Sequence, residues 1–239
     1  MKTLKEYLAE GMLDIEDNLD KDYNKLIKIR NWLNDYRHYV KKPIINNDMT
    51  IDAEIVDFSN FVDLREFPEY IKFNYIGKFF LKNCQQLRNC KGFPVKCDNM
   101  VITWVSKLTS FKDMPKNAKY TRIYLEGLAI DSLEGLPNTE RLHIISLDII
   151  DLKGMGNCKE LEIQSCEKLK SLKGISKKVK DLDIYGCGRL NNINDIPKYS
   201  LNKFRLTHSR ISQEDAEQCV AKNGKLNYNN SIPFHEWIS

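Results

Sequence analysis

The sequence lacks the patterns that mark membrane spans, nucleotide-binding loops and the commoner hydrolase sites. No apolar run within its 239 residues approaches the roughly 20 residues of a membrane-spanning helix, and the acidic N-terminus has no apolar core typical of a secretory signal. No G-x-S-x-G, P-loop or H-E-x-x-H motif occurs. The net charge is only +4, far from that of a chain built to neutralise many phosphates. We therefore expect a soluble protein with no membrane partner, and we disfavour nucleic acid as a ligand.

Residues for metal binding or catalysis are few and dispersed. The seven cysteines, an odd number, lack the paired C-x-x-C spacing of a zinc site, and the four histidines fall in different regions. His143 with its neighbouring carboxylates is the one constellation of note, but it has no evident nucleophile, because Cys166 is expected to be buried. A hydrolytic or transfer site needs a nucleophile and a base within hydrogen-bond reach. The sequence therefore predicts that the protein is not an enzyme and has no catalytic residues, metal or cofactor.

What the sequence does contain is an internal repeat with a period of about 21 residues, and self-similarity at such a period predicts a solenoid. The repeat is clearest where KELEIQSCEKLKSLKGI (159–175) is followed by KDLDIYGCGRLNNINDI (180–196). The first apolar residue of each unit recurs at nearly regular intervals, at Phe79, Met100, Ile123, Leu142, Leu161, Leu182 and Phe204. A second apolar residue follows two places later, which is the pattern of a strand with one buried face.

Further apolar positions recur after each predicted strand and should point inward as the chain turns away. The fifth residue after the first apolar position is Cys84, Val105, Leu128, Leu147, Cys166 or Cys187. The eighth residue is Leu87, Leu108, Ile150, Leu169 or Leu190. We interpret the stacked thiols as small apolar core residues, and reduced cysteines favour an intracellular compartment.

The pattern L-x-L-x-x-C-x-x-L-x-x-L-x-G-L-P resembles the short bacterial-type units of the leucine-rich repeat family. The resemblance covers about Phe79 to Ile211, with degenerate units back to Ile51, although the asparagine ladder of the family is replaced by Cys, Val or Leu. It implies an α/β solenoid with a parallel sheet on its concave face. We expect repeats over residues 46–211, an N-terminal cap helix over 21–45, and a C-terminal cap over 212–239 whose helix begins after Ser212.

The extreme N-terminus, MKTLKEYLAEGMLD, resembles the capsid-targeting leaders of tailed phages, which read M-K-T-x-x-E-[FY]-[IL]-x-E-[AG]. In that family the leader docks cargo on the scaffold of the immature head, and the prohead protease cuts after the Glu. The resemblance implies that residues 1–20 form an acidic leader helix, that Leu8 and Glu10 mark the processing site, and that cleavage leaves Gly11 as the new N-terminus. The alternative is an ordinary amphipathic helix that shields the first repeat.

Function in a solenoid usually resides on the outward side of its strands. On that side Glu160, Glu162, Asp181 and Asp183 should cluster between basic residues, since neighbouring strands lie about 4.8 Å apart. Facing like charges cost up to about 1 kcal/mol per pair, so either a basic partner, a cation, or local diagonal ion pairs must compensate. The predicted partner-binding residues are Phe80, Arg122, Tyr124, Arg141, His143, Glu160, Glu162, Asp181, Asp183, Tyr185 and Arg205.

These patterns favour a non-enzymatic protein-protein interaction module that uses the concave face of a leucine-rich repeat. Its partner would be another protein, of basic character if the acidic cluster is the binding site. The leader resemblance adds the head scaffold and the prohead protease as partners, and it implies a phage-encoded protein in the cytoplasm of the bacterial host or in the virion. The alternative is a cellular bacterial adaptor or scaffold with no virion role.

Overall fold

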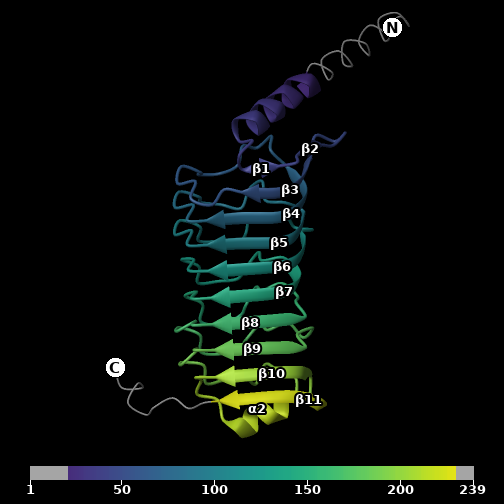
Figure 1. The fold of residues 1–239 in the computed structure, drawn as a ribbon. Helices are drawn as coiled ribbons and strands as arrows, with labels where there is room; N and C mark the ends of the chain where they lie inside the picture. The colour runs from purple at the N-terminus through teal and green to yellow at the C-terminus, as the bar shows by residue number, and fades with distance from the viewer. Residues whose placement is uncertain (1–20, 230–239) are drawn as a thin grey trace, which may run out of the picture.

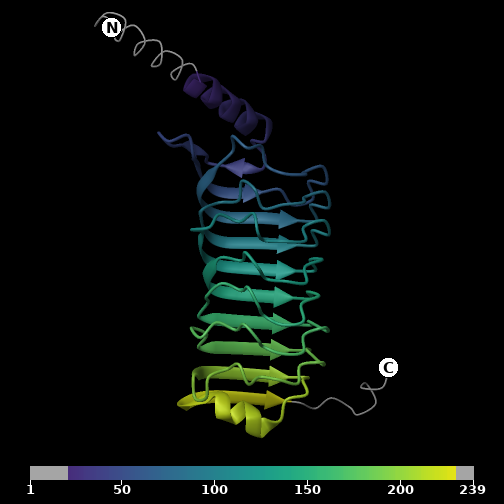
Figure 2. The ribbon, with the colours of Figure 1, turned by 180° about the vertical axis from the view of Figure 1, so that it is seen from behind.

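The chain forms a parallel β-solenoid of about nine turns, in a computed structural model that describes residues 21–229. Figure 1 shows the strands stacked in one column between a helical segment at each end, and Figure 2 shows the same column from behind. The helical segments are residues 21–35 and α2 (Gln213–Cys219). The strands are β1 (Val40–Lys41), β2 (Ile44–Ile45), β3 (Ile51–Asp57), β4 (Phe73–Lys82), β5 (Lys96–Thr103), β6 (Lys119–Glu126), β7 (Asn138–Ile145), β8 (Glu160–Gln164), β9 (Asp181–Tyr185), β10 (Leu201–Thr207) and β11 (Val220–Asn229).

All described strands belong to a single sheet. From β3 to β11 each strand pairs in parallel with the next, whereas β1 and β2 both pair antiparallel with β3. The predicted solenoid with a parallel sheet is therefore confirmed. The turns themselves differ from the expected α/β type, because no helix occurs within residues 36–212. The expected leader, residues 1–20, lies outside the described part of the chain.

The repeat spacing predicts the strand register correctly. The first apolar residues of the seven units lie side by side across the sheet, from Phe79 opposite Met100 to Leu182 opposite Phe204, and all are buried. The register continues to Val56 in β3 and Leu226 in β11. Units of slightly different length keep this register because the loops, not the strands, absorb the difference.

The turns after the strands bury the predicted fifth-position residues, including all three stacked cysteines. At the eighth position the prediction is wrong for Ile150, which is 56% exposed, while Ile149 is fully buried. The units that begin at Ile123 and Leu142 are the shortest of the series. Their chain reaches the core one residue earlier, as buried Ile130 also shows.

A left-handed backbone position follows every strand from β4 to β10. The fourth residue after each first apolar position has a φ between +51° and +66°, and these residues are Asn83, Trp104, Gly127, Ser146, Ser165, Gly186 and His208. Only two of the seven are glycines, although the left-handed region costs other residues roughly 1–2 kcal/mol. The conformation is therefore imposed by the packing of the turns.

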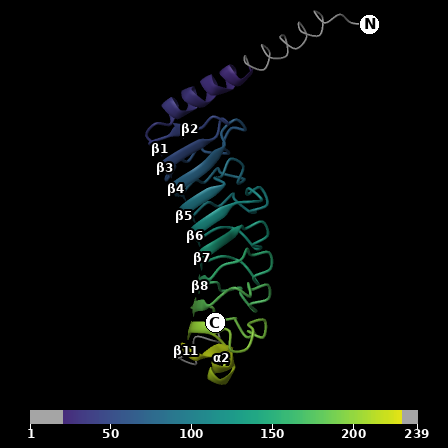
Figure 3. The same ribbon diagram turned by 90° about the vertical axis from the view of Figure 1, so that its right-hand side faces the viewer.

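Each end of the stack is covered by different elements. At the N-terminal end, the helix of residues 21–35 buries Ile29 and Trp32, and Trp32 contacts the rings of Phe58, Phe67 and Phe73. Figure 3 shows the first turns of this helix extending away from the stack, which agrees with the 63% exposure of Tyr23. Within residues 21–229, no helix is both long and apolar enough to cross a membrane.

At the C-terminal end, α2 begins where the sequence predicts, since the Ser212 hydroxyl accepts a hydrogen bond of 3.0 Å from the Asp215 backbone N–H. The helix is followed by β11, a further strand of the sheet, where the sequence analysis expects only a cap. Leu226 follows Phe204 by the same interval that separates Phe204 from Leu182, so β11 obeys the same spacing rule as the repeats.

Candidate interaction face of the sheet

The strand residues that alternate with the buried columns form what we term the open face of the sheet. Figure 3 shows the loops of the turns on the other side of the sheet, so no described segment covers the open face. The outward residues lie in register on this face and form two rows across the strands. The first row is Lys78, Asn99, Arg122, Arg141, Glu160, Asp181, Lys203 and Lys225, and the second row is Phe80, Val101, Tyr124, His143, Glu162, Asp183, Arg205 and Asn227.

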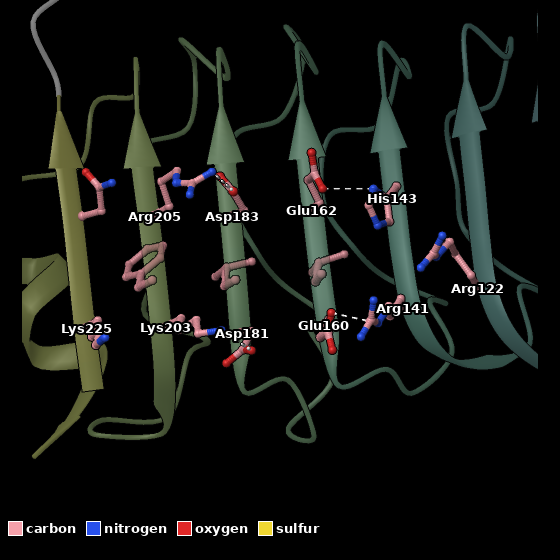
Figure 4. A pocket seen from close by; sticks show the side chains of 14 residues that line it. Arg122, Arg141, His143, Glu160, Glu162, Asp181, Asp183, Lys203, Arg205 and Lys225 are labelled. Atoms are coloured by element: carbon pink, nitrogen blue, oxygen red, sulfur yellow. Dashed lines mark hydrogen bonds and ion pairs between the residues drawn. The ribbon is translucent and has the colours of Figure 1, made fainter. Parts of the chain in front are cut away.

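The C-terminal half of the open face contains a shallow groove of about 570 Å³. Figure 4 shows side chains from six neighbouring strands, β6 to β11, along this groove. Its polar lining is Arg122, Arg141, His143, Glu160, Glu162, Asp181, Asp183, Lys203, Arg205, Lys225 and Asn227, and the strand residues between the two rows are Leu161, Leu182 and Phe204.

Every carboxylate of the groove lies beside a basic side chain. In the first row, Arg141 Nε is 3.0 Å from Glu160 Oε2, and Lys203 Nζ is 3.7 Å from Asp181 Oδ2. In the second row, His143 Nδ1 is 2.9 Å from Glu162 Oε2.

The fourth carboxylate is paired in the same way, with Arg205 Nη1 at 2.8 Å from Asp183 Oδ2. Local ion pairs therefore offset part of the negative charge of the acidic cluster. They differ from the expected diagonal pairs, because Arg141 lies directly opposite Glu160 and Lys203 directly opposite Asp181.

The centre of the groove still places like charges side by side. Glu160 faces Asp181 and Glu162 faces Asp183 across the boundary between β8 and β9. Burial raises the pKa of the Asp183 carboxyl, and the Glu162 charge adds to this effect while Arg205 opposes it. The ion pairs therefore compensate the crowding of the carboxylates only in part.

Three of the predicted binding residues lie on the open face outside the groove. The ammonium of Lys82 lies 5.3 Å from the centroid of the Phe80 ring. The Tyr124 hydroxyl donates a hydrogen bond of 3.0 Å to Glu126, and burial together with this carboxylate raises the pKa of Tyr124 to about 12. The Tyr185 ring makes an edge contact with His208 at a centroid distance of 5.3 Å. The other eight predicted residues line the groove.

Two groove residues, Lys225 and Asn227, are missing from the sequence prediction because they lie on β11. The alternation of polar Lys225 and Asn227 with Leu226 and Tyr228, at the repeat spacing from Phe204, is the signal that identifies them. Neither Arg122 nor Lys225 forms an ion pair within the described residues.

The groove offers an acid-base pair, His143 with Glu162, but no nucleophile beside it. The Cys166 thiol of the next turn is fully buried in the core, as the sequence predicts, and all seven cysteines are free and buried. Within residues 21–229, no group of three or more His, Cys, Asp and Glu side chains is arranged to hold a metal ion.

Comparison of the chain with protein-family models, curated proteins and solved structures returns no match, so the open face must be interpreted from its own geometry.

Proposed function

We propose that the chain is a non-enzymatic protein-protein interaction module that binds its partner on the open face. The observation that carries the proposal is the register of the two outward rows over eight strands, from β4 to β11, with no described segment above them. This arrangement presents charged and aromatic side chains on a rigid, extended surface. Exposed aromatic and arginine side chains are frequent anchors of protein interfaces.

A binding role is favoured over catalysis by the chemistry of the groove. Catalysis by His143 and Glu162 would need a nucleophile within hydrogen-bond reach of the pair. The nearest thiol, Cys166, is instead buried in the core. The ion pairs instead give the groove a fixed pattern of positive and negative positions, which is suited to recognising a partner of matching charge.

The same proposal includes two finer assignments that rest on sequence patterns. The apolar pattern of the units supports membership in the leucine-rich repeat class, with the open face corresponding to the strand side on which such repeats bind. The motif around Leu8, Glu10 and Gly11 supports a phage-encoded protein that enters the head through its leader and meets the scaffold and the prohead protease there.

A capture experiment with the purified chain as bait tests the proposed face. We expect a specifically captured protein to be lost when Glu162 and Asp183 are changed to Lys. It should also be lost in the exchange of Asp183→Arg with Arg205→Asp, which keeps an ion pair and so preserves the fold. The matched control is the exchange of Lys112→Glu with Glu134→Lys, an ion pair of 3.0 Å in the loops. Capture that survives both changes on the open face rules that face out as the binding site.

The leader is tested by intact mass and N-terminal sequencing of the protein recovered from purified particles of the phage that encodes it. We expect a mature chain that begins at Gly11. The substitution Glu10→Ala should leave the leader attached in the particles. Absence of the chain from particles would favour a cellular adaptor with no virion role.

A further inference from the structure

In the first row of the open face the charge changes sign twice, between β7 and β8 and again between β9 and β10. In the first row, Arg122 and Arg141 occupy β6 and β7, whereas Glu160 and Asp181 occupy the next two strands, β8 and β9. The nearest two positions on one side of the boundary between β7 and β8 are therefore positive, and the nearest two on the other side are negative. In the second row, the same boundary separates Tyr124 and His143 from Glu162 and Asp183.

This order is not the one that favours folding of a single chain. Alternating charges along a row would place opposite charges on both sides of every residue, but here Arg122 faces Arg141 and Glu160 faces Asp181. Each facing like-charged pair costs up to about 1 kcal/mol. Each of these charges therefore has an opposite neighbour on at most one side: Arg141 and Glu160 pair at 3.0 Å, and Asp181 pairs with Lys203 at 3.7 Å.

Over the four strands β6 to β9, the order of two positive and two negative positions is complementary to itself when it is reversed. Resting on the proposed function of the open face, we propose that its partner is a second copy of this chain. The two faces pack together around a two-fold axis that runs parallel to the strands at the boundary between β7 and β8. Such an axis reverses the order of the strands and keeps each row opposite itself, as an isologous interface requires.

The two-fold axis places the two positive positions of each copy opposite the two negative positions of the other, once on each side of the axis. Arg141 meets Glu160 of the second copy, and Arg122 meets Asp181 of the second copy, with the reciprocal contacts on the other side of the axis. In the second row, His143 meets Glu162 of the second copy. Arg122, which has no ion pair within the described residues, thereby gains a carboxylate.

The dimensions of the face suit a reversible dimer. Eight strands about 4.8 Å apart span about 35 Å, and five residues along each strand span about 16 Å. Two such faces bury about 1,100 Å² in total, which exceeds the roughly 1,000 Å² of the smallest biological interfaces and corresponds to a weak, reversible dimer. The outermost contact places Lys78 of one copy opposite Lys225 of the other, so Lys225→Glu should tighten the dimer. Because the contacts of Arg122 and Arg141 join opposite charges, high salt should weaken it.

Sedimentation equilibrium of the purified chain tests this proposal with two reciprocal variants. One variant carries Arg122→Glu and Arg141→Glu, and the other carries Glu160→Arg and Asp181→Arg. Each variant alone should be monomeric, with dimerisation weakened more than about tenfold, because the intermolecular contacts of Arg122 and Arg141 with Asp181 and Glu160 then join like charges. An equimolar mixture should form heterodimers, since the two altered faces are complementary.

Three results would overturn the inference: a wild-type chain that is monomeric up to about 1 mM, variants that dimerise as well as the wild type, or a mixture that stays monomeric. If a reversed variant does not fold, as judged by circular dichroism, the milder Arg122→Gln and Asp181→Asn variants should each weaken the wild-type dimer several-fold. A monomeric chain that still captures a different protein through the open face overturns the self-association and leaves the proposed function standing.

Discussion

At the scale of single residues, the left-handed position after each strand limits which side chains the turn accepts. Gly127 has a φ of +59°, and a Cβ there would lie 2.4 Å from the Trp104 ring. We expect Gly127→Ala to lower the free energy of unfolding by more than the about 1–2 kcal/mol that the left-handed backbone alone costs, because the Trp104 ring must also shift; urea denaturation measures the change.

Gly188 is the matched control for this substitution, because it lacks a positive φ and has nothing within 4 Å of the added Cβ. Gly188→Ala should leave stability unchanged or raise it by about 0.4–1 kcal/mol. In a Trp104→Ala background, the cost of Gly127→Ala should fall to the backbone contribution alone. Equal effects of the two alanine substitutions would contradict the assigned backbone constraint.

The Asp183 carboxyl gives the stability a predictable pH dependence. Burial raises its pKa in the folded state, so the folded chain holds the proton more tightly than the unfolded chain. Ionisation of Asp183 therefore reduces stability as the pH rises from about 4, the unfolded value, through the folded pKa. Relative to the wild type, Asp183→Asn should become more stable over this window, as measured by thermal melting.

Asp48 provides a control of opposite sign. Hydrogen bonds from Thr50 lower the pKa of the Asp48 carboxyl, so its ionisation favours the folded chain. Asp48→Asn should lose stability relative to the wild type as the pH rises through the folded pKa toward about 4. Parallel trends for the two variants would show that the burial of Asp183 does not govern the effect.

The sequence predicts inward residues better than it predicts their outward contacts. Periodicity identifies Leu161 and Ile163 as buried, because burial depends on alternation along one strand. Ile150 is misplaced because the length of each loop shifts the inward position. The partner of Arg141 depends on the exact register between neighbouring strands. The sequence suggests the correct partner, Glu160, but predicts a diagonal contact. In the structure the two residues are directly opposite.

At the scale of elements, α2 and β11 form the C-terminal end of the stack. The Ser212 side chain accepts a hydrogen bond from the Asp215 N–H and donates one of 2.6 Å to the Asp215 carboxylate. We expect Ser212→Ala to destabilise this end by about 1 kcal/mol. Hydrogen exchange should accelerate in α2 and β11, whereas Ser212→Asn should behave like the wild type. Faster exchange spread evenly over β4 to β8 would contradict a local capping role.

The strand β11 lies in a segment for which the sequence analysis predicts only a cap. A polar segment after the last clear repeat suggests a cap, and α2 confirms that interpretation for seven residues. The following ten residues instead form a strand whose outward side carries Lys225 and Asn227. The spacing from Phe204 predicts this strand, but the polar composition conceals the repeat because, besides Val220 at its start, the apolar residues of β11 that pack inward are Leu226 and Tyr228.

At the scale of the whole molecule, each turn contacts mainly the turns beside it, so local stability should decrease toward the ends. Burial raises the pKa of Cys158, in the middle of the stack, to about 12, and that of Cys219, at its C-terminal end, to about 11. We expect thiol reagents to label none of the seven buried cysteines under native conditions. In mild denaturant Cys219 should react first, as followed by mass spectrometry. Earlier labelling of Cys158 would contradict independent fraying of the end.

The uninterrupted register has a consequence for how such a chain can diversify. Deletion of one unit length, residues 141–159, would leave the core columns continuous and would bring Arg122 beside Glu160. Gain or loss of one unit therefore changes the length of the open face by about 4.8 Å. It also changes the order of charges, but only where two strands become new neighbours. New specificities can arise by recombination between units, with no change to any buried residue.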